Sequence, residues 1–391
     1  MEKKIDAQAL PLVLAVSVLM LLGIMTAWSG VDLLSRSNRR YHSQRQREAD
    51  LVSALALMHR DSTARDSVRV PSGKSLRVCR ERWGLYEILL AECPDRTSME
   101  LCGAAEEHPV RAALWLADHN RPLALSGNAC LEGPVYVTMS GINYVEREGK
   151  YFSGLAVPDS SRYLSALRLP AVDTRAVARL DSLWAMADRS IDIRNHPGGY
   201  CSFKEETIWV NAFRCTPSGR LFGHAVLFGE KVILGPELDA RDVLILAESV
   251  QVKRGFRGPC QIICKDSVTV ESGAHLSFPS GVLVQKGGIV LKRDAIVEGY
   301  VAVLSGEGTM DKPALVTYKD SRIAGLVYVS GPAELHGEVS GAAYLDDCLA
   351  GRKPSPSPGA MHDVRIVRAD SLAFPLLMRG RFTRKRIKKV H

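Results

Sequence analysis

Residues 246–255 read Leu-Ala-Glu-Ser-Val-Gln-Val-Lys-Arg-Gly, and residues 264–273 read Cys-Lys-Asp-Ser-Val-Thr-Val-Glu-Ser-Gly. The two stretches are 18 positions apart (246 to 264) and share an acid, Ser, Val, Val and Gly in the same places. A looser third copy follows at residues 288–291, Gly-Ile-Val-Leu. Self-similarity at a short fixed period is typical of a solenoid, whose coils stack on one another.

Short apolar runs surround these copies from residue 208 to residue 345. Each run is rich in Val, Ile and Leu and ends in Gly, Asp, Ser or Pro, as β-strands do. An antiparallel sandwich or barrel has similar strands and remains the alternative, but it gives no reason for identities at a fixed offset. We therefore predict a mainly β chain built around a parallel β-helix.

A second internal match lies further apart along the chain. Residues 126–135 and 330–339 share the frame Ser-Gly-x-Ala-x-Leu-x-Gly-x-Val. This match predicts a solenoid over residues 121–350. Residues 145–199 then form a partly helical insertion between coils, because apolar side chains recur there at helical spacing. Insertions in solenoids form loops on one face and often bind partners.

The N-terminal region predicts a membrane anchor. Residues 7–31 carry no formal charge, and Trp28 stands where an interfacial aromatic belongs. We assign residues 1–7 to a short tail and residues 8–31 to a transmembrane helix in contact with the lipid bilayer. A cleaved signal peptide and a buried soluble helix are the alternatives, but the apolar stretch is longer than a signal peptide's.

Basic residues on both sides of the span bear on its orientation. Lys3 and Lys4 precede it, and five arginines follow it within residues 36–47. A simple count places the C-terminal side in the cytoplasm, but long trailing domains translocate despite their charge. We favour a single-pass protein of the bacterial inner membrane with a periplasmic C-terminal domain.

The remaining segments follow from composition. Residues 32–70 place apolar side chains at three- and four-residue steps and predict an amphipathic helical stalk. Residues 71–120 predict a small α+β unit. Residues 351–391 combine a Pro/Ser linker with a basic tail, which we expect to be solvated rather than bound to nucleic acid.

Composition favours a folded protein without an obvious reaction centre. The chain of 391 residues is 46% hydrophobic and carries a net charge of +8, which belongs mainly to its flanks. Nine cysteines without a CxxC pair predict buried side chains and one or two disulfides rather than zinc ligands.

No residue pattern predicts chemistry. Asp346 and Asp347 are adjacent, so they point to opposite faces of a strand, and Asp239 and Asp242 flank Arg241 in a turn. The sequence has no HxH, HExxH or GxSxG motif. We predict no catalytic residue, no cofactor-binding residue and no metal ligand, although a Ser-His-Asp set assembled from distant positions stays open.

Two short blocks carry a resemblance. Trp83 to Glu87 (Trp-Gly-Leu-Tyr-Glu) and Leu125 to Asn128 (Leu-Ser-Gly-Asn), together with the pilin-like membrane helix, resemble a group of uncharacterised bacterial envelope proteins. The Gly-spaced turns are similar to those of bactofilins, which are polymer-forming β-solenoids. The prepilin cleavage pattern is absent. The first resemblance implies an anchored β-helix and no particular activity.

The function that these patterns favour is a non-enzymatic, membrane-anchored scaffold of the bacterial cell envelope. It would act in assembly or surface interaction, by self-association or with an envelope protein or polysaccharide. One alternative is a carbohydrate-active β-helix enzyme. The other is a cytoplasmic, membrane-tethered filament former similar to bactofilins.

Overall fold

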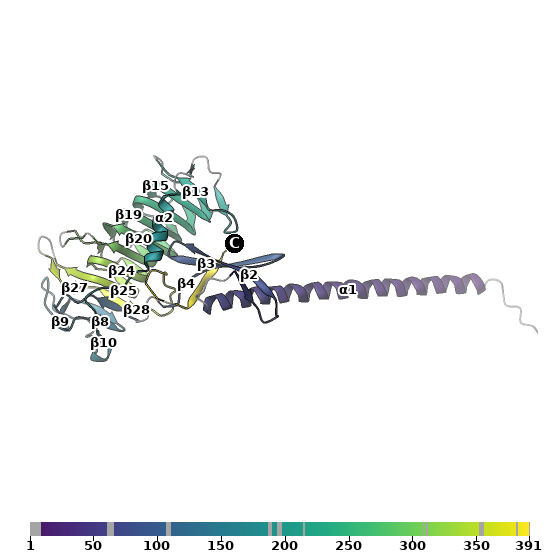
Figure 1. Ribbon diagram of the computed structural model, residues 1–391, viewed down its shortest axis with the longest axis horizontal. Coiled ribbons are helices and arrows are strands. Elements are labelled where there is room, and N and C mark those ends of the chain that lie inside the picture. Colours follow the sequence, from purple (N-terminus) through teal and green to yellow (C-terminus); the bar gives the residue numbers. More distant parts are fainter. Residues whose placement is uncertain are drawn as a thin grey trace, which may run out of the picture.

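The computed structural model describes residues 9–60, 66–106, 111–186, 190–193, 198–213, 216–306, 308–309, 312–351, 356–380 and 382–390. A long helix leads to a small antiparallel sheet, and a parallel β-solenoid of about 12 turns lies against that sheet (Figure 1). The predicted parallel solenoid is confirmed, because neighbouring rungs pair in parallel rather than as hairpins.

The solenoid strands form three faces that repeat from rung to rung. The strands of its middle part are β11 (Ile191–Asp192), β12 (Gly199–Cys201), β13 (Ile208–Asn211), β14 (Gly219–Gly223), β15 (Ala225–Leu234), β16 (Leu238–Arg241), β17 (Val243–Val252), β18 (Arg257–Gly258), β19 (Cys260–Val270), β20 (His275–Lys286), β21 (Gly288–Leu291), β22 (Ile296–Ser305), β23 (Leu315–Thr317), β24 (Arg322–Glu334) and β25 (Glu338–Ala350).

The sequence repeat corresponds to stacked neighbours. Val250 pairs with Val268, which pairs with Ile289 on the next rung. All three side chains point into the solenoid and are at most 3% exposed. Full burial of such a side chain contributes about 1.5–3 kcal/mol, so an uninterrupted apolar column stabilises the stack.

One face of the solenoid is buried on both sides. On it, Ile262 points inward, whereas the next residue, Ile263, points outward and is just as buried. The small sheet and the segment after residue 165 cover this outer surface. Double burial explains why these strands are continuous apolar runs rather than alternating ones.

The order of the coils differs from the prediction. The N-terminal coils stack on the C-terminal end of the solenoid. Their strands are β5 (Leu114–Leu116), β6 (Leu123–Ser126), β7 (Cys130–Glu132), β8 (Val135–Val137), β9 (Ile142–Tyr144) and β10 (Arg162–Leu164). They lie beyond β25, β26 (Ser357–Pro358), β27 (Ala360–His362) and β28 (Arg365–Arg368). Leu114 pairs with Ala343, and Leu131 pairs with Ile366. The N-terminal coils therefore close the C-terminal end.

Residues 165–186 consequently run back along the solenoid instead of forming an insertion between neighbouring coils. The Tyr328 hydroxyl donates to the Pro170 carbonyl at 3.2 Å, and Gln285 donates to Asp181 at 2.6 Å. Helix α2 (Thr174–Trp184) lies in this segment, and η1 (Asp159–Ser161) precedes it. The segment then enters β11, which pairs with β13 at the other end.

The small sheet has the order β1-β2-β3-β4-β29, with β1 (Ser67–Arg69), β2 (Ser75–Trp83), β3 (Tyr86–Cys93), β4 (Arg96–Ala104) and β29 (Arg384–Val390). The α+β unit predicted at 71–120 is not confirmed, since the described part of that segment contains strands and no helix. Residues 384–390 form an edge strand instead of a solvated tail, because Val390 and Ile387 pack in the core between sheet and solenoid.

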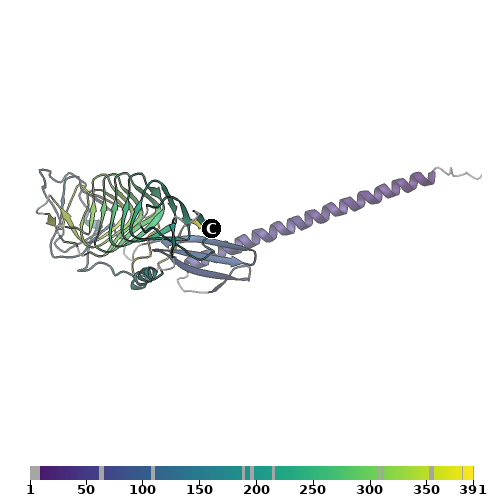
Figure 2. The ribbon, with the colours of Figure 1, turned by 90° about the horizontal axis from the view of Figure 1, so that it is seen from above.

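Helix α1 (Ala9–Arg60) is long and apolar enough to cross a membrane. It projects away from the rest of the molecule (Figure 2). Its last turns lie on the small sheet, where Leu51, Leu55 and Met58 are buried. The helix is continuous from residue 9 to residue 60, shorter than the stalk predicted to residue 70. The predicted tail at 1–7 and residues 352–355 of the predicted linker lie outside the described residues.

The cysteines form no disulfide among the described residues. All eight that the structure describes are free thiols, against the expectation of one or two bridges. Most are buried in the solenoid or the small sheet, where they pack as small apolar side chains.

Candidate functional site

Hydrogen bonds from one side chain join the small sheet to the solenoid. Gly84 and Leu85 form the turn between β2 and β3, and Gln261 of β19 reaches this turn. Its Oε1 accepts from the Leu85 N–H at 3.0 Å, and its Nε2 donates to the Trp83 carbonyl at 2.9 Å. The Tyr300 hydroxyl donates to the same Oε1 at 3.0 Å. The block from Trp83 to Glu87 therefore contains the turn that joins the small sheet to the solenoid, with the end of β2 before it and the start of β3 after it.

Gly84 is required at this turn. Its φ is +60°, and a Cβ there would lie 2.3 Å from the Gln261 Oε1. Only glycine combines this backbone conformation with such a close approach at little cost.

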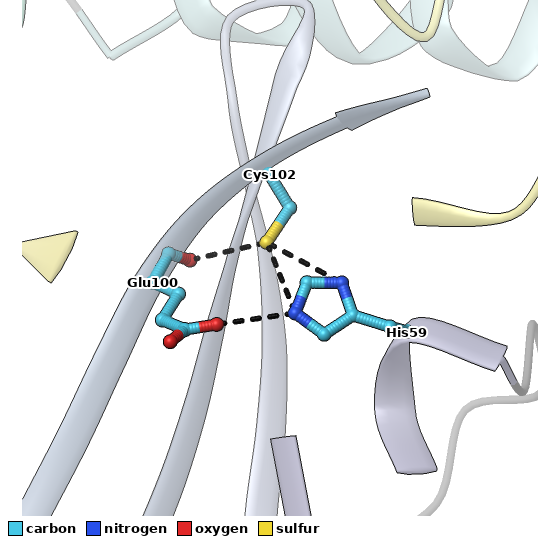
Figure 3. Close-up of side chains that lie close together, drawn as sticks. All are labelled: His59, Glu100 and Cys102. Atoms are coloured by element: carbon cyan, nitrogen blue, oxygen red, sulfur yellow. Dashed lines mark hydrogen bonds and ion pairs between the residues drawn. The ribbon is translucent and has the colours of Figure 1, made fainter. Parts of the chain in front are cut away.

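The structure brings His59, Glu100 and Cys102 together where α1 ends on the sheet (Figure 3). His59 Nε2 lies 3.1 Å from Glu100 Oε2, and Cys102 Sγ lies 3.9 Å from either ring nitrogen. Glu100 and Cys102 are two positions apart on β4, so they point to the same side of the sheet. That spacing was the only signal in the sequence.

The charges in this cluster are already balanced. Arg386 Nη1 lies 3.3 Å from Glu100 Oε1. Burial raises the pKa of Glu100, but the His59 hydrogen bond and the Arg386 charge outweigh it, so the pKa is lowered. Burial raises the pKa of Cys102 to about 12. The three residues offer ligand types that zinc accepts, but Glu100 is ionised and already held by His59 and Arg386. We call this buried contact between α1 and β4 the latch.

A serine, a histidine and an aspartate meet where residues 360–363 stack on the N-terminal coils. Ser126 Oγ lies 3.0 Å from His362 Nδ1, and His362 Nε2 lies 3.4 Å from Asp363 Oδ2. Asp363 also accepts from Lys150 at 2.9 Å and from the Asn128 N–H at 2.8 Å. Ser126 is completely buried. A hydroxyl sealed from solvent cannot attack a substrate, so this set joins two coils.

The acids considered in the sequence have structural roles. Asp347 accepts from the Gly359 N–H at 3.2 Å and pairs with Arg121 at 2.5 Å, which fixes a chain turn. Asp239 pairs with Arg241 at 2.9 Å. Asp242 binds Lys388 of β29, and its carbonyl accepts from Trp83 Nε1 at 2.8 Å. None of these contacts resembles a pair of cooperating catalytic carboxylates.

A groove of about 1050 Å³ lies beside β19, β21 and β23. Its walls carry Lys and Arg side chains next to acids, among them Arg293, Lys319 and Glu334, and Tyr318 is 49% exposed there. A mixed-charge groove of this volume that is open to solvent suits a larger partner better than an enclosed small substrate.

A second hollow, of about 670 Å³, is lined by arginines where β2, β3 and β29 approach α2. Neither hollow was foreseen, because their walls come from segments far apart in the sequence. No family model, no curated protein and no solved structure matches this chain.

Proposed function

We propose that this protein is a non-enzymatic, membrane-anchored scaffold of the bacterial cell envelope, with α1 in the inner membrane and the solenoid in the periplasm. The observation that supports it is a continuous line of buried contacts from α1 to the solenoid. Leu55 of α1 packs against the small sheet, and Gln261 bonds that sheet to the rungs.

Such a line of contacts sets the direction of the solenoid relative to α1. A flexible linker would serve a tethered enzyme equally well, whereas a scaffold needs its faces held in place. The two ends of α1 carry apolar side chains in different surroundings. Leu19 and Leu22, toward its N-terminus, are more than half exposed, whereas Leu55, toward its C-terminus, is buried on the small sheet. Exposed apolar residues over the first turns suit lipid tails.

The groove beside β21 is the surface we assign to an envelope partner, either a protein or a polysaccharide. Asp346 and Asp347, the adjacent acids of the sequence, are not among the described residues that line this groove, and two of the acids that do line it are held by basic neighbours. Glu334 lies 2.9 Å from His336, and Asp363 is held by Lys150. This distribution favours binding over hydrolysis, which normally uses two carboxyl groups flanking the bond.

Protease accessibility in spheroplasts tests the proposal. The full chain carries an epitope tag after residue 391, and intact spheroplasts are treated with protease beside permeabilised ones. Loss of the tag in intact spheroplasts, with a cytoplasmic marker preserved, is expected. Protection of the tag until the membrane is permeabilised would overturn the periplasmic assignment. Release of the whole chain into the soluble fraction would overturn the anchor.

A further inference from the structure

The arginine-lined cleft has a floor in which positive charge exceeds negative charge. Glu87 is buried, and Arg384 Nε lies 3.0 Å from its Oε2, with the Arg384 side chain only 9% exposed. Arg82 Nε lies 3.1 Å and Arg80 Nε lies 4.0 Å from the same carboxylate. One carboxylate thus faces three guanidinium groups.

The excess of positive charge is not fully neutralised within the described part of the chain, and Arg82 shows this. Its Nη1 is buried and has no hydrogen-bond partner among the described residues. Burial lowers the pKa of Arg82, and the charges of Arg179 and Arg384 lower it further, although Glu87 opposes them. A partly buried charge without full compensation is costly, and an anion would remove that cost.

Helix α2 adds two more arginines from the other wall. Arg175 and Arg179 are four positions apart, so they lie on the same face of α2, and both are exposed. The acid next to them, Asp173, is used as the helix cap and accepts from the Arg175 N–H at 3.0 Å. Glu81, on β2, lies 3.6 Å from His224 Nε2. Altogether five arginines and three carboxylates line the described cleft.

We infer that this cleft binds the phosphate group of a small molecule that is not a lipid of the anchoring membrane. Guanidinium groups reach the cleft from β2, β29 and α2, and a tetrahedral phosphate offers oxygens in several directions, whereas a carboxylate accepts in one plane. A volume of about 670 Å³ leaves room for the molecule that carries the phosphate.

The exclusion of membrane lipid rests on the proposed function, but the site itself does not. Arg80, which lines the cleft, donates from Nη2 to the Met58 carbonyl at 3.1 Å, so the cleft lies level with the end of α1. Residues 32–58 separate the predicted span from that level, and a helix of that length measures about 40 Å. A headgroup of the same bilayer would lie too far from the cleft if α1 stands upright.

Calorimetric titration of the full chain in a neutral detergent tests the site, with inorganic phosphate and pyrophosphate as probes at constant ionic strength. Saturable binding is expected for the unchanged protein. The double variant Arg175→Gln with Arg179→Gln should bind at least about tenfold more weakly, because two charge-assisted bonds are lost. Both residues are exposed, so the variant should fold, and its melting temperature verifies this.

The matched control is Arg254→Gln with Arg257→Gln, which removes the same charge from two exposed positions of a solenoid coil outside the cleft. It should bind like the unchanged protein. Equal weakening in both double variants, or no saturable binding of either probe, would overturn the site. Binding to phosphatidylglycerol vesicles over phosphatidylcholine vesicles that depends on Arg175 and Arg179 would overturn the assignment to a non-lipid phosphate. These measurements do not depend on where the protein lies in the cell.

Discussion

The side chain of Gln261 accepts a hydrogen bond from the backbone N–H of Leu85, 176 positions earlier in the chain, at 3.0 Å. With its second bond, to the Trp83 carbonyl, this amide satisfies both backbone groups of a buried turn. This one polar side chain thereby joins the small sheet to the solenoid, beside the contacts that Trp83 and Lys388 make with Asp242.

Replacing Gln261 should loosen this joint. Gln261→Leu leaves two buried backbone groups without partners, which costs about 2–5 kcal/mol in the free energy of unfolding. Urea denaturation followed by tryptophan fluorescence measures it, because Trp83 lies at the joint. Gln251→Leu, at a partly exposed position on a neighbouring strand, is the control and should cost less than about 1 kcal/mol. Equal costs would contradict the role of Gln261.

Shortening a side chain in the β-strands should lower stability only where that side chain points into the solenoid. Val268 points inward and is 1% exposed, so Val268→Ala should lower the free energy of unfolding by about 1–3 kcal/mol. Thr269 points the other way, and Thr269→Ala should change it by less than about 0.5 kcal/mol. Denaturation curves of the two variants give the comparison, and a larger effect at Thr269 would argue against the assigned register.

The latch at the end of α1 should depend on pH. The pKa of Glu100 is lowered on folding, so its contribution is complete above its ordinary pKa of 4.5 and is lost as the pH falls through the lower folded value. Glu100→Gln should flatten the fall of the melting temperature between about pH 5 and pH 3. Glu92→Gln, at a carboxylate of the same sheet that is 45% exposed, should leave that slope unchanged. A slope unaltered by Glu100→Gln would refute the latch.

The packing of α1 on the sheet should depend on Leu55 and not on Val52, which lies one turn earlier. Leu55 is 2% exposed, whereas Val52 is 57% exposed. Leu55→Ala should raise amide hydrogen exchange over the last two turns of α1 and cost about 2–4 kcal/mol, because it opens a cavity. Val52→Ala should leave exchange unchanged. If both variants exchange alike, the helix is not held by this contact.

The repeat around residues 246–273 was sufficient to predict parallel rungs, because each coil buries its neighbour through the same local pattern. The apolar stretch at 8–31 likewise predicted α1 by length and composition. Periodicity reports which side chains are hidden, and that information is local.

The order of the coils was decided only by the tertiary structure. Leu114 could have begun the solenoid from its own end, but it stacks on Ala343 because residues 165–186 return along an outer face that needs cover. The tertiary structure alone likewise decided the place of β29 in the small sheet and the cleft lined by Arg82, Arg175 and Arg384. Their partners lie far apart in the chain, and complementarity between distant faces leaves no periodic trace in the amino-acid sequence.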